Sequence, residues 1–76
     1  MQINYSRQSI KQLLKISSPY RQKIKLAIEE LPGGDVIKLQ KPLEGYRMRV
    51  GDYRVLFDKE NHIIEINAIY HRRDAY

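Results

Sequence analysis

Two runs of alternating apolar and polar residues flank a Gly-Asp pair between residues 45 and 57, and they specify a β-hairpin. With Gly51-Asp52 as the two-residue loop, the register pairs Val50 with Tyr53. The pairs farther from the loop are Met48 with Val55, Arg47 with Leu56, and Tyr46 with Phe57. One face of this hairpin is apolar throughout, so the rest of the chain has to cover it.

The other face of the hairpin collects Arg47, Arg49 and Arg54, and it sets Arg49 directly opposite Arg54. Opposed like charges destabilise a sheet by up to about 1 kcal/mol, a cost that Thr or Glu would avoid. Guanidinium groups match the geometry of phosphate, so the pattern favours an anionic ligand held by three arginines. The alternative is a solvated sheet face on which Asp52 and Glu65 spread the charge.

A second hairpin is expected to extend the sheet through the connection at residues 59–62. The register that continues the apolar face sets Phe57 opposite Ile64, Val55 opposite Ile66, and Tyr53 opposite Ala68. It also places Asn67 beside Arg54 on the arginine face.

The N-terminal part of the chain has the pattern of a short strand at residues 2–5 followed by a helix. Ser6 is placed to cap this helix, which is expected to run to about Ile16. Its apolar face is predicted to contain Ile10, Leu13 and Leu14.

Ser18-Pro19 offers an N-cap and a first-turn proline for a second helix, which Leu31-Pro32-Gly33-Gly34 ends. The apolar positions of this helix are Tyr20, Ile24, Ala27, Ile28 and Leu31. The segment after it, with Val36, Ile37, Leu39 and Leu43, is expected to tuck under the edge of the sheet. These elements predict an α+β fold, an N-terminal αα-hairpin packed on a small antiparallel β-sheet, as one domain over residues 1–76.

Composition narrows the classes of function. The chain has 76 residues and no cysteine, which excludes disulfides, thiol nucleophiles and cysteine-ligated metals and leaves room for one thin core. We expect no enclosed cofactor pocket, no bound cofactor and no metal site. The sequence shows no signal peptide and no membrane span, so a cytoplasmic protein is expected. The net charge of +5 favours an anionic partner such as nucleic acid or an acidic protein.

Two further groups of residues are candidates for function. The first comprises the basic residues of the two helices, which are Arg7, Lys11, Lys15, Arg21, Lys23 and Lys25. The second lies at the C-terminus, where His71 is a candidate for proton transfer and Tyr76 for base stacking or proton transfer. Solvated helix faces and ordinary polar residues are the alternatives for both groups.

The run from Gly45 to Phe57, followed by an apolar strand and His-Arg-Arg-Asp-Ala-Tyr, resembles the RelE/ParE superfamily of bacterial toxins, and in particular its RelE-like branch. The order of elements resembles that family over nearly the whole chain. The resemblance implies a metal-independent endoribonuclease that cleaves mRNA, in many relatives at the ribosomal A site. It also implies a cognate antitoxin as partner, with the toxin as a monomer in a hetero-oligomeric complex.

By this resemblance, the catalytic positions of the family correspond to Arg47, Arg49, Arg54, Arg72 and Tyr76. Several relatives have lysine where this chain has Arg47 and Arg49, and a guanidinium is a poor general base. We therefore expect His71 to be the base, while the six basic helix residues bind ribosomal RNA.

Two other functions remain open from the sequence. One is ParE-like inhibition of DNA gyrase without nuclease activity, which the same fold allows. The other is a nucleic-acid-binding module with no activity of its own.

Overall fold

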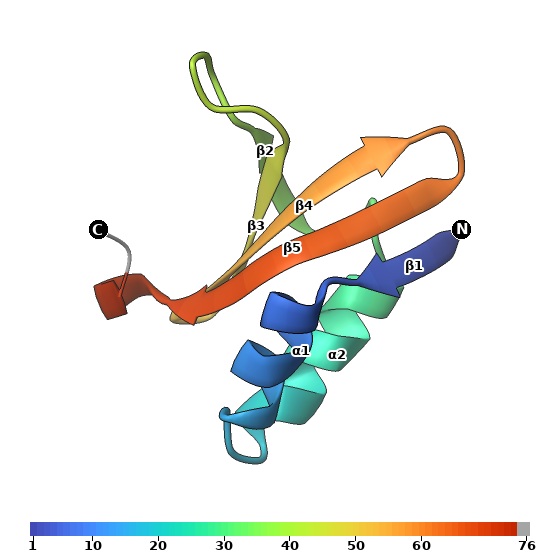
Figure 1. The fold of residues 1–76 in the computed structure, drawn as a ribbon. Coiled ribbons are helices and arrows are strands. Elements are labelled where there is room, and N and C mark those ends of the chain that lie inside the picture. The colour runs from blue at the N-terminus through green and yellow to red at the C-terminus, as the bar shows by residue number, and fades with distance from the viewer. Residues whose placement is uncertain (75–76) are drawn as a thin grey trace.

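The computed structural model describes residues 1–74, and in it two helices cover one face of a five-stranded sheet (Figure 1). The elements in chain order are β1 (Gln2–Tyr5), α1 (Arg7–Leu14), α2 (Tyr20–Glu29), β2 (Asp35–Lys38), β3 (Tyr46–Val50), β4 (Tyr53–Glu60), β5 (Ile63–His71) and the 3₁₀ helix η1 (Arg72–Asp74). The strand order across the sheet is β1-β5-β4-β3-β2. The predicted α+β fold with an N-terminal helical hairpin on a sheet is confirmed.

The sheet is mixed, because β1 pairs with β5 in parallel while the other neighbours are antiparallel. Because β1 runs parallel to β5, the chain continues from β1 alongside the second half of β5. There the Ser6 amide donates to Ile66 O at 2.9 Å and the Ser6 hydroxyl donates to Asn67 O at 3.0 Å. Gln12 then accepts a hydrogen bond from the Ile69 amide at 2.7 Å. The edge of β5 is thus satisfied by α1 beyond the end of β1.

The docking of α1 against β5 also decides which of its faces is buried. Ser6 caps the helix as predicted, accepting from the Ser9 amide at 3.0 Å. Ser9 and Leu13 are buried, whereas Ile10 and Leu14 remain 45% and 62% exposed, so the predicted apolar face was wrong for these two residues. The small Ser9 side chain, whose hydroxyl donates to Ser6 O at 2.8 Å, faces the protein interior instead.

The second helix begins one residue later than predicted. Its N-cap is Pro19, which makes no side-chain cap hydrogen bond, so the predicted Ser18 cap was wrong. Ile24 and Ile28 are buried as expected, while Tyr20 is 50% exposed. The segment predicted to tuck under the sheet forms β2, an edge strand paired with β3. Of its apolar residues, Ile37 is exposed because an edge strand has little to pack against on its open side, and Leu43 is exposed in the connection between β2 and β3.

The core lies between the helices and the apolar face of the central strands. Its most deeply buried side chains are Ile24, Ile28, Met48, Val55, Phe57, Ile64, Ile66 and Ile69. The predicted register of β3 and β4 is confirmed at every pair, from Val50 with Tyr53 to Tyr46 with Phe57. Gly51 in the turn has a φ of 58°, a conformation that glycine adopts at low cost.

The predicted register of β4 and β5 was wrong. The turn is the two-residue Asn61-His62, with Asn61 at a φ of 55°, and it sets Phe57 opposite Ile66. A register shift between Leu56 and Phe57 then leaves Asn67 as an extra residue in β5. The side-chain Nδ2 of Asn67 donates to Asp58 Oδ2 at 2.8 Å. Asn67 is therefore not beside Arg54, and Tyr70 occupies that position.

Gly45 at the start of β3 provides a test of this packing. Its φ is +94°, and a Cβ there would lie 2.7 Å from Asp58 Oδ1 and 2.9 Å from Phe57 O. We expect Gly51→Ala, whose Cβ would meet nothing within 4 Å, to lower the free energy of unfolding by about 1–2 kcal/mol through backbone strain alone. Gly45→Ala is expected to cost about 1–3 kcal/mol more, because the collision adds to the strain. Urea denaturation measures both, and equal losses would contradict the β3–β4 geometry.

Tyr5 offers a second test, in the region where β1 meets the helices. Burial, assisted by the carboxylate of Glu29, raises the pKa of Tyr5 above its ordinary value. The folded state therefore retains the phenol proton at a pH where the unfolded chain has released it, so the stability contributed by Tyr5 declines as the pH rises past about 10. Tyr5→Phe is expected to show a smaller alkaline loss of unfolding free energy than the wild type. A Tyr5→Phe profile parallel to that of the wild type would refute the assignment.

Candidate functional site

The bulge at Asn67 sets which side chains meet at the C-terminal end of β5. Beyond it, Tyr70 lies opposite Arg54 and His71 lies opposite Tyr53. Because side chains alternate along a strand, Arg54 and His71 belong to opposite faces of the same end of the sheet. Arg54 is on the open face, and His71 is on the face that the helices cover.

The open face contains the three arginines predicted from the hairpin, but their charged groups have different partners. Arg49 donates from Nε to Asp35 Oδ2 on the edge strand β2 at 2.7 Å, and its Nη2 lies 2.7 Å from the same oxygen in an ion pair. Arg54 instead turns back over the β3–β4 loop, where Nη1 donates to Gly51 O and Tyr53 O, each at 2.9 Å. Arg47 lies half-buried between Ile37 and Leu56 on the neighbouring strands.

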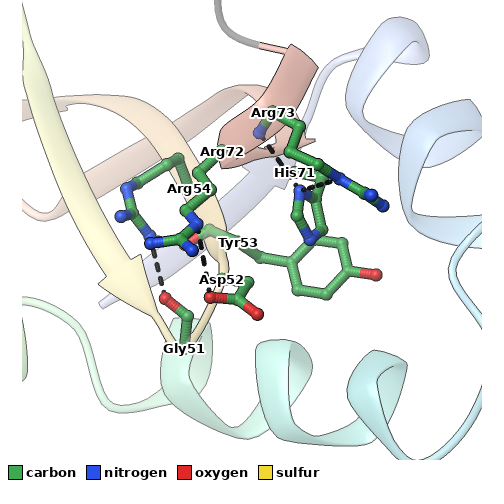
Figure 2. Close-up of polar contacts among 7 residues, drawn as sticks. All are labelled: Gly51, Asp52, Tyr53, Arg54, His71, Arg72 and Arg73. Carbon is green, nitrogen blue, oxygen red and sulfur yellow. Dashed lines mark hydrogen bonds and ion pairs between the residues drawn. The ribbon is translucent and has the colours of Figure 1, made fainter.

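Arg72 joins Arg54 at the loop (Figure 2). Its amide donates to Asp52 O at 2.7 Å, and its Nε lies 3.5 Å from Asp52 Oδ1. The structure therefore brings Arg54 and Arg72, which are far apart in sequence, onto the two residues of one turn. Arg72 and Asp52 are both mostly exposed, so this ion pair is weak and accessible to a competing anion.

His71 lies on the other side of this turn, against Tyr53, with ring centroids 5.1 Å apart and planes at 82° (Figure 2). Its Nδ1 accepts hydrogen bonds from the Arg73 amide at 3.1 Å and from Arg73 Nε at 3.4 Å. Consecutive residues of η1 thus point to different places, Arg72 toward Asp52 and Arg73 toward His71. Tyr53 and Arg73 were not predicted as site residues. The bulged register brings Tyr53 to His71, whereas Arg73 reaches His71 locally, through the turn of η1.

The basic residues of the helices do not form one surface. Arg7, Lys11 and Lys15 line one shallow hollow along α1. Lys23 faces the end of the sheet near His71, whereas Lys25 lines a different hollow with Leu26 and Glu29. Arg21 is used internally, since its Nε donates to Ile16 O at 2.8 Å and its Nη2 to Leu14 O at 3.3 Å, which ties the end of α1 to α2.

Three other expectations concern Tyr76, a metal site and a membrane span. Tyr76 lies outside the described residues. Within residues 1–74 there is no group of three or more His, Cys, Asp or Glu side chains placed to hold a metal ion. Over the same range, neither helix has the length and apolar character needed to cross a membrane.

Known proteins resemble this chain over nearly its whole length. A family model described as "ParE toxin of type II toxin-antitoxin system, parDE" matches residues 3–76. Toxin RelE3 of Methanocaldococcus jannaschii is 27% identical over 84 residues, which cover all of this chain and 96% of the relative.

Solved structures give the same result. The RelB–RelE antitoxin–toxin complex from Methanococcus jannaschii matches with a TM-score of 0.78 at 26% identity, over 92% of this chain and 91% of the relative. The archaeal RelE–RelB complex from Pyrococcus horikoshii OT3 matches with a TM-score of 0.72 at 27% identity, over 97% of each chain. The YoeB dimer from Staphylococcus aureus, at 23% identity and a TM-score of 0.73 over 93% of this chain and 97% of the relative, shares the fold. The chain therefore belongs to the RelE/ParE superfamily and is a toxin of the type II toxin–antitoxin class, RelE-like by homology.

Proposed function

We propose that this toxin is an endoribonuclease that cleaves mRNA at the ribosomal A site without a metal ion, and that it acts in the cytoplasm, where ribosomes are found. The observation that best supports this proposal is the pair of guanidinium groups from Arg54 and Arg72 on the Gly51-Asp52 turn (Figure 2). The similarity to RelE toxins points to the same activity.

The chemistry of RNA cleavage suits this arrangement. The reaction needs the 2′-hydroxyl deprotonated, the charge of the phosphorane neutralised and the leaving 5′-oxygen protonated. Cations held at the position where the negative charge of the phosphorane develops are the most effective means of neutralising that charge. We assign this role to Arg54 and Arg72, while Arg47 and Arg49 hold the scissile and neighbouring phosphates on the open face.

His71 remains our candidate for proton transfer. Because its Nδ1 accepts from Arg73, the neutral imidazole carries its proton on Nε2. In this tautomer the Nε2–H can donate a hydrogen bond to a phosphate oxygen, whereas transfer of a proton to the leaving 5′-oxygen requires the doubly protonated imidazolium, in which Nδ1 no longer accepts from Arg73. Acting as the base for the 2′-hydroxyl, the role expected from the sequence, requires Arg73 to release Nδ1 first. Tyr76 keeps its proposed role in base stacking or proton transfer.

The exposed helix cations support binding to ribosomal RNA. The row formed by Arg7, Lys11 and Lys15 is suited to salt-dependent phosphate contacts, and Lys23 and Lys25 add charge on α2. Arg21, also expected to bind RNA, contributes by holding the helices together.

We also propose a cognate antitoxin as partner, with the toxin as a monomer within a hetero-oligomeric complex. The basis is that RelE proteins from Methanococcus jannaschii and Pyrococcus horikoshii were crystallised with RelB antitoxins.

Inhibition of DNA gyrase is the second candidate function, and the match to the ParE family model favours it. Incubation of the purified toxin with programmed ribosomes, and separately with gyrase and plasmid, separates the two candidates. Cleaved mRNA with unchanged gyrase supports the proposal. Trapped gyrase with intact mRNA refutes it.

The main prediction concerns Arg54. Arg54→Ala should lower ribosome-dependent mRNA cleavage by about 10²- to 10³-fold, because it removes a cation from the developing charge. Arg54 also donates to the turn, so circular dichroism and thermal unfolding must show that the variant is folded. Lys59→Ala, on the same strand but distant from the turn, is the matched control and should cleave like the wild type. A folded Arg54→Ala variant with unchanged cleavage contradicts the assignment.

A second prediction concerns the Arg49–Asp35 ion pair, whose side chains are 58% and 52% exposed. A pair this exposed contributes at most about 1 kcal/mol to stability. Asp35→Asn should therefore leave the fold intact while freeing Arg49 for phosphate, and so tighten binding of a short uncleavable RNA severalfold. Fluorescence anisotropy measures this affinity. The double variant Asp35→Asn/Arg49→Ala should lose the gain; a gain that persists without Arg49 would show that the bridge is not what limits binding.

A further inference from the structure

A cavity of about 360 Å³ opens on the face of the sheet opposite the arginines, between α2 and the β3–β4 turn. This volume is at the lower end of the range for small-molecule sites. Its lining includes Tyr20, Lys23, Tyr53, His71 and Arg73. The proposed cleavage chemistry leaves most of this cavity without a role.

One wall of the cavity is aromatic. The rings of Tyr20 and Tyr53 lie with centroids 6.0 Å apart and planes at 42°, and the ring of His71 meets Tyr53 edge-on. Tyr20 is 50% exposed even though it is a large ring at the start of a helix. An exposed ring backed by a second aromatic side chain is a surface on which a planar base can stack.

Two cationic side chains, those of Lys23 and Arg73, line the same cavity. Neither Lys23 nor Arg73 takes part in the ion pairs found among residues 1–74, which are Arg49 with Asp35 and Arg72 with Asp52. The one carboxylate of the lining, Asp52, lies near Arg72. Positive charge beside an aromatic wall matches a ligand that joins a planar ring to a phosphate.

We propose that this cavity binds one nucleotide of the RNA strand, next to the scissile phosphate, with its base on Tyr20 and its phosphate at Lys23 and Arg73. The proposal rests on the proposed ribonuclease function and adds to it a residue, Tyr20, whose stacking gives a modest preference for the base beside the cut. Its geometric basis is η1, where Arg72 and Arg73 direct one guanidinium to each side of the Gly51-Asp52 turn (Figure 2). A strand whose phosphate lies at Arg54 and Arg72 therefore leads its next nucleotide around the turn into the cavity.

Direct binding tests the proposal without any need for cleavage. The ¹⁵N-labelled toxin is titrated separately with the four nucleoside 5′-monophosphates, adenosine, inorganic phosphate and an acidic peptide, and the amide shifts are followed by NMR. We expect saturable shifts at Tyr20, Tyr53 and His71 for at least one nucleotide. Tyr20→Ala should weaken its binding about 5- to 150-fold, the range for loss of one stacked base, and Tyr20→Phe should restore it.

A second variant, Lys23→Ala, changes an exposed residue of α2. It tests the proposal even if the Tyr20→Ala variant does not fold. It should weaken the nucleotide about 2- to 5-fold, as for loss of an exposed ion pair, and leave adenosine unaffected. The matched control Gln22→Ala lies on the same helix but outside the cavity lining, and it should bind as the wild type does. Three results would overturn the proposal: no shifts at the cavity, phosphate binding as tightly as every nucleotide, or an acidic peptide shifting these amides while nucleotides do not.

Mapping of cleavage sites separates this proposal from the one on which it rests. If the wild type cleaves mRNA and Tyr20→Ala shows the same base preference beside the cut, the nucleotide site is refuted and the ribonuclease function stands. If the wild type binds nucleotides in the cavity and cleaves no mRNA, the ribonuclease function is refuted instead.

Discussion

β4 and β5 pair in one register near the Asn61-His62 turn and in another beyond Leu56, because Asn67 is inserted in β5 without a partner on β4. This added residue rotates the end of β5, so that Tyr70 lies beside Arg54 and His71 beside Tyr53. If Asn67 were instead paired with Leu56 in a regular ladder, the side chains that follow it in β5 would occupy the opposite faces of the sheet. One bulge therefore decides that the arginines lie on one face of this end of the sheet while His71 lies on the other.

A small chain without disulfides has to hold this end of the sheet by packing and hydrogen bonds alone. The N-terminal segment does this by satisfying the open edge of β5, first through β1, then through Ser6, and finally through Gln12 and the Ile69 amide. The cost is that Ile10 and Leu14 stay exposed on α1. Arg21 adds to the same scaffold by bonding the last carbonyls of the α1 region.

The sequence predicted the parts of the fold that depend on local pattern. Alternation around Gly51-Asp52 identified the β3–β4 register, and Ser6 identified the start of α1. It failed where distant segments decide the outcome: an unpartnered Asn67 has no local signal, and the buried face of α1 depends on β5. For the same reason the arginines of the candidate site were placed on the correct face, while the proximity of Arg72 to the turn and the cavity beside His71 emerged only from the structure.

The account as a whole depends on phosphate binding at the Gly51-Asp52 turn. A crystal structure of the toxin with a short RNA, blocked by a 2′-O-methyl group at the cleaved nucleotide, tests this most directly. We expect a phosphate within hydrogen-bonding distance of both the Arg54 and Arg72 guanidiniums, with the Arg72–Asp52 contact opened. RNA bound along α1 with the turn unoccupied, or a phosphate that contacts neither arginine, would contradict it.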